Sequence, residues 1–275
     1  MGIETRGVSR GAGLTKSQIQ NPKSIVITGA SGGIGLALAR HYLERGAIVA
    51  AFARRGELLQ TLAAEFPGKV FCYTLDVRDA PAIQRAAGDF MARVGVPDIV
   101  IANAGVSRGT LTEYVEDEEV FQNVMDINVL GMVKTFQPFL APMRAAKQGT
   151  LVGIASVAGF RGLPGSGAYS SSKAAAITYL ESLRVEMHGS GVKVVTLCPG
   201  FIKTPMTDIN TYPMPFILEA DDAAKRMARV IARGTAFAVV PWQMWVIGWV
   251  IKRLPRWLYD RLFAKAPHKA RSSVA

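Results

Sequence analysis

SIVITGASGGIG, residues 24–35, decides the fold. Its first five residues form a short apolar run with a β-branched bias, as expected of a strand that is buried on both faces. The run leads directly into a turn with Gly29, Gly33 and Gly35, and a helical pattern then continues to Gly46. A strand, a glycine loop and a helix in this order aim free backbone N–H groups and the positive end of a helix dipole at a phosphate. The spacing G-x-x-x-G-x-G differs from the commoner G-x-G-x-x-G, but its place between strand and helix predicts a dinucleotide cradle rather than a simple turn.

Short apolar segments and helical patterns alternate along the rest of the chain. We expect strands at residues 24–28, 47–53, 70–75, 98–102, 150–155, 193–198 and 236–241. We expect helices at residues 36–45, 57–65, 80–94, 117–146 (bent near Gly131 and Pro138), 169–188 and 220–233. This alternation predicts an α/β fold of the Rossmann type, a doubly wound parallel sheet of about seven strands with helices on both faces.

The domain organisation follows from the same pattern. Residues 1–22 are polar and rich in Gly, Ser and Thr, and we expect a flexible N-terminal extension there. We expect residues 23–241 to form one domain, because no linker or internal repeat interrupts them. Residues 242–275 are an apolar and basic C-terminal extension of that domain, which we expect to be helical.

Composition limits the class of protein. The chain has 275 residues, of which 49% are hydrophobic and 19% charged, so it can bury a large core and is not a disordered chain. Cys72 and Cys198 lie in apolar runs without metal-ligand spacing, which favours buried thiols in a reducing compartment and no metal site. The N-terminus has no apolar segment typical of a secretory signal, so we expect a cytoplasmic protein.

Polar and glycine residues follow the predicted strands at their carboxyl ends, where ligands bind in sheets of this kind. Arg54 and Arg55 follow the second strand, and Ala53 stands where a carboxylate would bind the ribose of NAD. Arginine forms charge-assisted hydrogen bonds to a 2′-phosphate, whereas a carboxylate would repel it. We therefore predict NADP(H) in preference to NAD(H); a solvated helix start is the alternative interpretation of the two arginines.

Tyr169 and Lys173 lie four positions apart in a predicted helix and so project from the same face. An ammonium group near a phenol favours the phenolate and lowers its pKa, which would suit a tyrosine for proton transfer near neutral pH. The same spacing also occurs where an aromatic residue lies at the edge of a core beside a solvated lysine.

Five motifs together resemble those of the short-chain dehydrogenases/reductases over about residues 24–205. They are TGASGGIG at residues 28–35, NAG at 103–105, Ser156, Tyr169-x-x-x-Lys173 and Pro199-Gly200. The resemblance implies that Tyr169 is the acid/base, that Lys173 lowers its pKa and holds the nicotinamide ribose, and that Ser156 binds the substrate oxygen. It also implies that Asn128 helps to hold a water molecule in a proton relay to Lys173.

The predicted catalytic residues are therefore Asn128, Ser156, Tyr169 and Lys173. The predicted cofactor-binding residues are Gly29, Ser31, Gly32, Gly33, Ile34, Gly35, Arg54, Arg55, Asp76, Val77, Asn103, Ala104, Gly105, Tyr169, Lys173, Pro199, Gly200, Ile202 and Thr204. The resemblance implies hydride transfer between NADP(H) and a carbonyl or alcohol carbon. It also implies a homo-oligomer, dimer or tetramer. An NADP(H)-binding, membrane-associated scaffold or sensor without turnover is the alternative.

The end of the chain departs from the family pattern. All four tryptophans lie within residues 242–257, and residues 252–275 hold seven basic residues against one acidic, more than half of the net charge of +11. One interpretation is peripheral membrane contact through residues 242–265, with tryptophans at the headgroup level. The other is an apolar helix that covers the substrate cleft or a subunit interface. No nucleic-acid recognition motif accompanies the basic charge, so we expect no nucleic-acid partner.

The substrate is expected to be a small hydrophobic molecule resembling a lipid, steroid, retinoid or fatty-acyl compound. The basis is the loop after Pro199-Gly200, where residues 212–216 are mostly apolar. Loops at this place in the family close over substrate.

Overall fold

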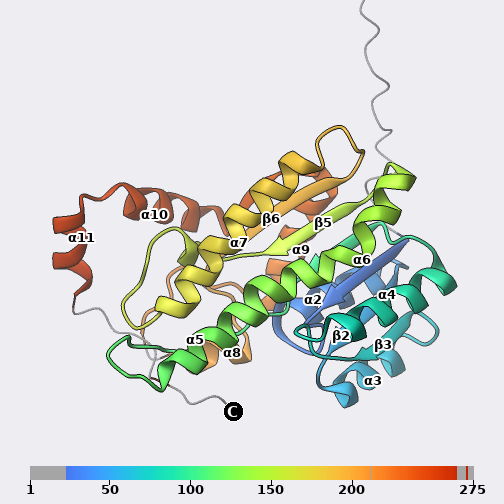
Figure 1. The fold of residues 1–275 in the computed structure, drawn as a ribbon, viewed down its shortest axis with the longest axis horizontal. Coiled ribbons are helices and arrows are strands. Elements are labelled where there is room, and N and C mark those ends of the chain that lie inside the picture. Colours follow the sequence, from blue (N-terminus) through green and yellow to red (C-terminus); the bar gives the residue numbers. More distant parts are fainter. Residues whose placement is uncertain (1–22, 211, 265–270, 272–275) are drawn as a thin grey trace, which may run out of the picture.

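Seven parallel strands form one sheet in the order β3-β2-β1-β4-β5-β6-β7 in the computed structural model, which describes residues 23–210, 212–264 and 271 (Figure 1). The strands are β1 Ser24–Thr28, β2 Ile48–Ala53, β3 Val70–Thr74, β4 Ile99–Ala102, β5 Thr150–Ile154, β6 Lys193–Pro199 and β7 Phe237–Val240. The predicted doubly wound Rossmann-type sheet is confirmed, and each strand begins and ends within one residue of the prediction. The expected extension at residues 1–22 lies outside the described residues.

Helices cover both faces of the sheet. One face carries α2 Gly33–Leu43, α3 Gly56–Glu65 and α9 Ala220–Arg233. The other carries α4 Ala80–Val94, α6 Gly131–Ala146 and α7 Gly167–Glu186, and α5 Asp117–Met125 packs against α7. Two further helices, α10 Trp242–Arg253 and α11 Arg256–Phe263, follow β7 and project from the body of the molecule (Figure 1).

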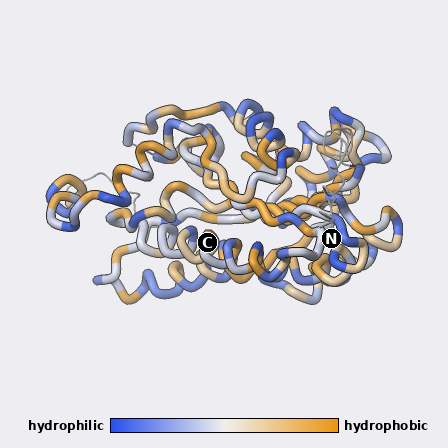
Figure 2. Tube along the Cα trace, turned by 90° about the horizontal axis from the view of Figure 1, so that it is seen from above, coloured by the Kyte–Doolittle hydropathy of each residue, from blue (hydrophilic) through white to orange (hydrophobic). Residues whose placement is uncertain are grey.

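Alternating side chains of each strand build two cores. Ile25 and Ile27 of β1 pack with α2 and α9, whereas Val26 between them packs on the opposite face with α4 and α6. Successive residues of a strand point to opposite faces, so a strand buried on both sides must be apolar throughout. Figure 2 shows the hydrophobic strands between helices whose outer edges are hydrophilic.

The predicted long helix over residues 117–146 is interrupted. A π-helical turn, Asp126–Leu130, separates α5 from α6, so the break lies just before Gly131. Pro138 lies inside α6 and does not end it. The π turn carries Asn128, whose side chain is fixed to the backbone of Val106, and this contact accompanies the irregular geometry.

The order of the strands places the binding crevice. The chain winds from β1 outwards to β3, then returns to the other side of β1 to form β4. The loops that leave β1 and β4 therefore diverge, and ligands of such sheets bind at that switch point beyond the carboxyl ends. Because α10 follows β7 directly, it also begins at this end of the sheet. Among the described helices, none has both the length and the apolar content required to cross a bilayer.

Candidate active site

A cleft of about 420 Å³ opens at the carboxyl ends of the strands. Every predicted catalytic or cofactor-binding residue lines it, with the exception of Gly35 and Asn128. Ala53, which stands in place of a carboxylate, also lines the cleft. Further lining residues that the sequence did not single out are Phe52, Leu75, Val106, Ile127, Ile154, Ala155, Pro205, Met206 and Thr207. These are mostly apolar neighbours of the motif residues, and the sequence pattern alone gives them no distinguishing signal.

The glycine loop is shaped by close contacts that leave no room for side chains. A Cβ at Gly29, whose φ is +69°, would lie 2.9 Å from the Asn103 amide nitrogen, and one at Gly35 would overlap the carbonyl oxygen of Gly29. A Cβ at Gly33 would lie 3.2 Å from the methyl group of Thr204. The loop therefore lies in contact with the segments that follow β4 and β6. No side chain of the described residues caps the start of α2, so its first N–H groups can meet an anion.

Thr28 connects the glycine loop to the end of the neighbouring strand β4, a role that its position in the sequence motif did not indicate. Its hydroxyl oxygen accepts hydrogen bonds from the backbone N–H groups of Asn103 and Ala104, both at 3.1 Å. The Asn103 side chain in turn donates to the carbonyl oxygens of Thr28 and Gly29. These bonds hold the ends of β1 and β4 in fixed positions. The one sequence feature that could have indicated this role is that Thr28 is the last residue of β1.

Arg55 extends over the glycine loop. Its guanidinium donates to the Ser31 hydroxyl oxygen from Nη2 at 3.1 Å and from Nε at 3.3 Å. Arg54 is also exposed at this end of β2 and lines the cleft. Ser31 is 8% exposed, and its hydroxyl and the Arg55 guanidinium form a basic, hydrogen-bonding corner of the cleft. A phosphate group fits the donors of this corner.

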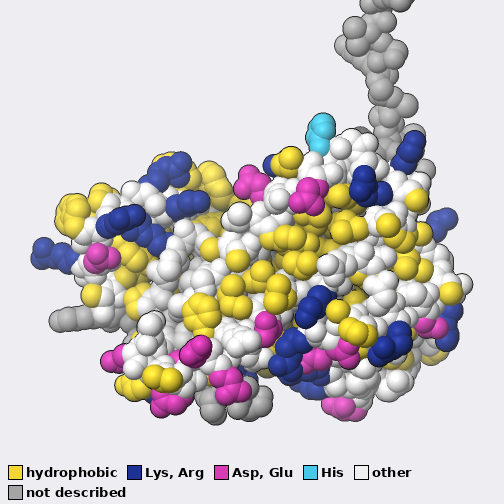
Figure 3. Space-filling model, in the orientation of Figure 1, with side chains coloured by type: hydrophobic (Ala, Val, Ile, Leu, Met, Phe, Trp, Pro, Cys, Tyr) yellow, Lys and Arg dark blue, Asp and Glu magenta, His cyan; other side chains and the backbone are white. Residues whose placement is uncertain are grey.

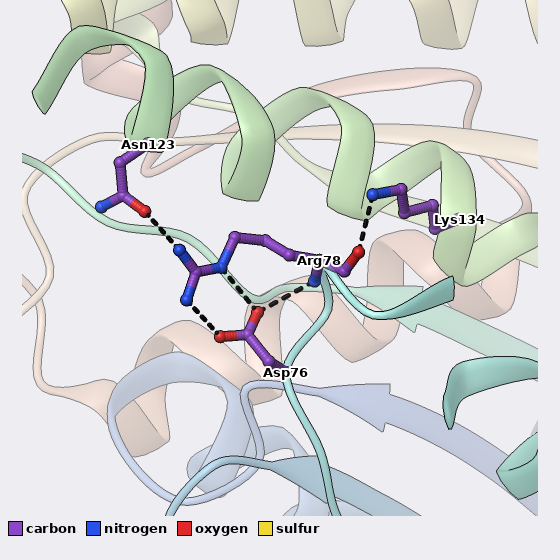
Figure 4. Close-up of polar contacts among 4 residues, drawn as sticks. All are labelled: Asp76, Arg78, Asn123 and Lys134. Carbon is purple, nitrogen blue, oxygen red and sulfur yellow. Dashed lines mark hydrogen bonds and ion pairs between the residues drawn. The ribbon is translucent and has the colours of Figure 1, made fainter. Parts of the chain in front are cut away.

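Asp76, at the adjacent edge of the cleft, is held by Arg78 (Figure 4). The guanidinium contacts both carboxylate oxygens, at 3.1 Å from Nε and 2.8 Å from Nη2, and holds the pKa of Asp76 below its usual range. Arg78 also donates to Asn123 of α5, and its carbonyl oxygen accepts from Lys134 of α6. Arg78, in the β3–α4 loop, therefore holds the Asp76 carboxylate in place and joins it to α5 and α6. Nothing in the sequence pattern indicated these contacts.

Ser156, Tyr169 and Lys173 converge at the opposite end of the cleft. Ser156 follows β5, and the other two lie in the first turns of α7. Tyr169 is hydrogen-bonded to Ser156, and the Ser156 hydroxyl lies 3.4 Å from the carbonyl oxygen of Pro199. The Lys173 amine lies 5.8 Å from the centre of the Tyr169 ring and donates to the carbonyl oxygen of Ile154 at 2.9 Å.

The pKa of Tyr169 differs from the sequence expectation. We expected Lys173 to lower it, but in this structure burial raises the pKa of the phenol, and the hydrogen bond with Ser156 only partly opposes that effect. The reason is geometric, because the Lys173 amine bonds to Ile154 rather than to the phenol oxygen. Burial likewise lowers the pKa of Lys173 to about 8, since no described carboxylate lies beside it.

Asn128 lies behind the cleft and is 1% exposed. Its side-chain oxygen accepts from the N–H of Val106 at 2.8 Å, and its nitrogen donates to the carbonyl oxygen of Val106 and to Ser172, both at 2.9 Å. The amide is therefore committed to fixing the loop after β4 against α7. A contribution to a proton relay stays a prediction.

No described residue of the C-terminal helices lines the cleft, but α10 packs against loops that border it. Met244 of α10 packs on Gly200, where a Cβ would lie 3.2 Å from the Met244 Cβ, and Gly248 packs on the ring of Phe160. Arg161 donates to the carbonyl oxygens of Ile251 at 2.8 Å and Leu254 at 2.7 Å, at the end of α10. The loop between Ser156 and Tyr169 is thereby attached to α10. The inner face of α10 is therefore occupied by these loops, and both interpretations of the segment stay predictions.

The chain is similar to known oxidoreductases over most of its length. The family model for short chain dehydrogenases matches residues 23–212. An uncharacterized oxidoreductase of Myxococcus xanthus is 41% identical over 241 residues, which are 86% of this chain and 95% of the relative. A 3-ketodihydrosphingosine reductase of Bacteroides thetaiotaomicron is 35% identical over 187 residues, 68% of this chain and 66% of that protein.

A solved structure agrees with this relationship. The alcohol dehydrogenase of the archaeon Thermococcus sibiricus, in complex with 5-hydroxy-NADP, superimposes with a TM-score of 0.70 at 28% identity and covers 79% of this chain and 95% of that one. The fold, the motifs at the carboxyl ends of the strands and these matches all agree, and the chain belongs to the short-chain dehydrogenase family of oxidoreductases.

Proposed function

We propose that the protein is an NADP(H)-dependent reductase or dehydrogenase that interconverts a carbonyl and an alcohol on a hydrophobic substrate. The observation that carries the proposal is the convergence of Ser156, Tyr169 and Lys173 on one end of a cleft whose other end is the glycine loop. A hydrogen-bonded Ser–Tyr pair beside a buried amine is suited to move a proton to or from a substrate oxygen.

NADP(H) fits the cleft by the chemistry of its donors. The cleft beside Gly29, Gly32 and Gly33, with the uncapped start of α2, suits a pyrophosphate, and Arg55 with Ser31 suits a 2′-phosphate. Asp76 and Val77 would lie on the adenine side, and Lys173 would hold ribose hydroxyls. Bound NADP(H) would supply or accept the hydride at the substrate carbon.

The chain's own residues would handle the proton. In reduction, the Tyr169 O–H donates its proton to the substrate carbonyl oxygen, and in oxidation the phenolate accepts it back. The Ser156 hydroxyl donates a hydrogen bond to the same oxygen and stabilises the charge that develops there. An ammonium form of Lys173, once its nitrogen moves from Ile154 towards the phenol, would favour the phenolate.

The substrate side of the cleft supports an apolar molecule. Pro199, Met206 and Ile202 line the cleft, and Phe160 and Met244 lie behind the neighbouring loops. The name of the Bacteroides relative denotes a ketone with a long hydrocarbon chain, which agrees with a lipid-like substrate. Steroids, retinoids and fatty-acyl compounds are the related candidates. Two free cysteines, Cys72 and Cys198, suit a reducing, cytoplasmic setting.

The test is turnover followed at the NADPH absorbance with a panel of long-chain, cyclic and small ketones and aldehydes. Tyr169→Phe should lower kcat by about 10²–10⁴-fold while NADPH binding is retained. Tyr179→Phe, further along the same helix, is the matched control and should leave turnover unchanged. If NADPH binds tightly but no carbonyl reacts, the alternative of a cofactor-binding scaffold or sensor replaces the enzyme; if NADPH does not bind, both are wrong.

A further inference from the structure

The outward face of α10 exposes more large apolar side chains than is usual for a surface helix. Trp242, Trp245, Val246, Trp249 and Val250 are all exposed, and Trp242 keeps 67% of its surface accessible. Their spacing of three and four residues places them on one face of the helix. The opposite face, with the buried Met244 and Gly248, already packs on the cleft loops, so the exposed stripe is an additional apolar surface.

The next helix extends this surface. Trp257 and Leu262 of α11 are 68% and 59% exposed, whereas Tyr259 on the other side is buried and donates to the carbonyl oxygen of Gly162 at 2.5 Å. Arg161 stacks over the Tyr259 ring at 4.0 Å and also binds the end of α10. Both helices are therefore fixed to the body on their inner faces, and their tryptophans point away from it.

Basic side chains border the apolar surface at the end of α10 and along α11. Lys252, Arg253, Arg256 and Arg261 are exposed against the single acidic residue Asp260 between 242 and 264. None of the four forms an ion pair with a carboxylate of the described residues, and Arg253 stacks over the Trp249 ring at 4.0 Å. Figure 3 shows yellow hydrophobic and dark blue basic side chains intermingled on this projecting part of the molecule.

The combination favours a lipid surface over a second copy of the chain. Exposed tryptophans bordered by cations match the boundary between acyl chains and anionic headgroups. A second copy packed on the same face would bring two positively charged surfaces together, which costs free energy. The helix α10 has 12 residues, about 18 Å, and is too short for a hydrocarbon core of about 30 Å, so it would lie in the interface.

We propose that the outer face of α10 and α11 docks on the surface of an anionic lipid bilayer. The docking itself does not depend on the enzymatic activity. Its consequence does rest on the proposed function: because the inner face of α10 contacts Gly200 and Phe160, a docked protein holds the substrate end of its cleft next to the membrane. A lipid-like ketone could then enter without crossing water.

The experiment uses the full chain with NADPH and vesicles of phosphatidylcholine alone or mixed with phosphatidylglycerol. Co-sedimentation should be strong with the mixed vesicles, weak with phosphatidylcholine alone and reduced by high salt. Tryptophan emission should shift to shorter wavelength only when the mixed vesicles are present. No co-sedimentation with the mixed vesicles overturns the proposal, whether or not any carbonyl is turned over.

Two variants and two matched controls locate the surface. Trp245→Ser with Trp249→Ser, and Lys252→Glu with Arg256→Glu, should each weaken vesicle binding by at least about tenfold. Val115→Ser with Val185→Ser, and Arg85→Glu with Arg144→Glu, change exposed residues elsewhere and should bind as the wild type does. NADPH binding by all four confirms that they fold. Equal binding by all four variants overturns the proposal, as does a tryptophan variant that dissociates an oligomer while its vesicle binding is unchanged.

Discussion

The guanidinium of Arg271 forms a two-point ion pair with the carboxylate of Asp117. Nε lies 3.0 Å from Oδ2 and Nη2 lies 3.1 Å from Oδ1. Arg271 also stacks over the Tyr114 ring at 3.4 Å, and the Asp117 carboxylate accepts from the N–H of Leu111 at 2.7 Å. One residue near the C-terminus is thus joined to the loop between β4 and α5. This loop leaves the sheet on the same side as the cleft.

We predict that Arg271→Ala loosens this loop, because the enclosed Asp117 carboxylate loses its ion-pair partner. The variant should have a lower Tm and faster proteolysis within residues 107–116, measured by thermal unfolding and by mass spectrometry of the fragments. Arg144→Ala, at an exposed position of α6, is the control and should behave as the wild type. Unchanged cleavage within the loop would show that the ion pair does not restrain it.

The same ion pair predicts a pH dependence. Hydrogen bonds from Arg271 and Leu111 lower the pKa of Asp117 below its ordinary value of 3.8. A lowered folded-state pKa means that the stabilisation is complete above the unfolded value and is lost as the pH falls through the folded value. The difference in Tm between wild type and Asp117→Asn should therefore be constant near neutral pH and shrink below about pH 4. A difference that grows on acidification would contradict the assignment.

Arg55 should determine the choice of cofactor. Its two donors lie at Ser31, where a 2′-phosphate would be bound, and hydrogen bonds to a charged group contribute about 1.5–3 kcal/mol. Arg55→Ala should weaken NADPH binding by roughly 10- to 100-fold and leave NADH binding nearly unchanged, as measured by fluorescence titration. Arg85→Ala is the control. Equal loss for both cofactors would mean that Arg55 supports the fold of the loop instead.

Burial of the Lys173 amine should lower the free energy of unfolding of the cofactor-free protein. Its pKa is lowered to about 8 from 10.5, so the folded state holds fewer protons than the unfolded state between these values, and stability rises with pH across that window. The cost is complete below about pH 8 and amounts to roughly 3 kcal/mol by the size of the shift. Lys173→Met should abolish turnover and remove this rise in stability, measured by urea unfolding at several pH values. If the variant's stability rises with pH as steeply as that of the wild type, a group other than Lys173 causes the rise.

Two glycines should respond oppositely to alanine. A Cβ at Gly35 would overlap the Gly29 carbonyl, so Gly35→Ala should destabilise the protein by about 1–3 kcal/mol and weaken NADPH binding. Gly88, inside α4, has no atom within 4 Å of such a Cβ. Gly88→Ala should stabilise by about 0.5–1 kcal/mol through helix propensity, and chemical denaturation measures both changes. Destabilisation of both variants by the same amount would refute the steric argument.

Much of the site could be predicted from the sequence because its residues occupy strand ends. Gly29, Asp76, Asn103, Ser156 and Pro199 each follow an apolar run, and parallel strands bring such positions to one edge. The spacing of Tyr169 and Lys173 likewise placed both on one helix face.

Other features could not be predicted, because they depend on contacts between distant residues. Arg161 meets Ile251 across 90 residues, and Arg271 meets Asp117 across 154. The partner of the Lys173 amine, on which the direction of the Tyr169 pKa depends, is a backbone carbonyl of β5. The sequence predicted a bend near Gly131, but not that the irregularity is a π turn which brings the Asn128 side chain to the backbone of Val106.

The sequence by itself determined the sheet, the order of its strands along the chain and the residues at the cleft, since hydrophobic period and glycine spacing are local properties. Only the tertiary structure decided which face of α10 is free. Phe160, Gly200 and Arg161 occupy one side of that helix, and this packing leaves the tryptophans outward. A periodic sequence pattern indicates that a helix has two different faces, but the residues that pack on the helix decide which face is buried.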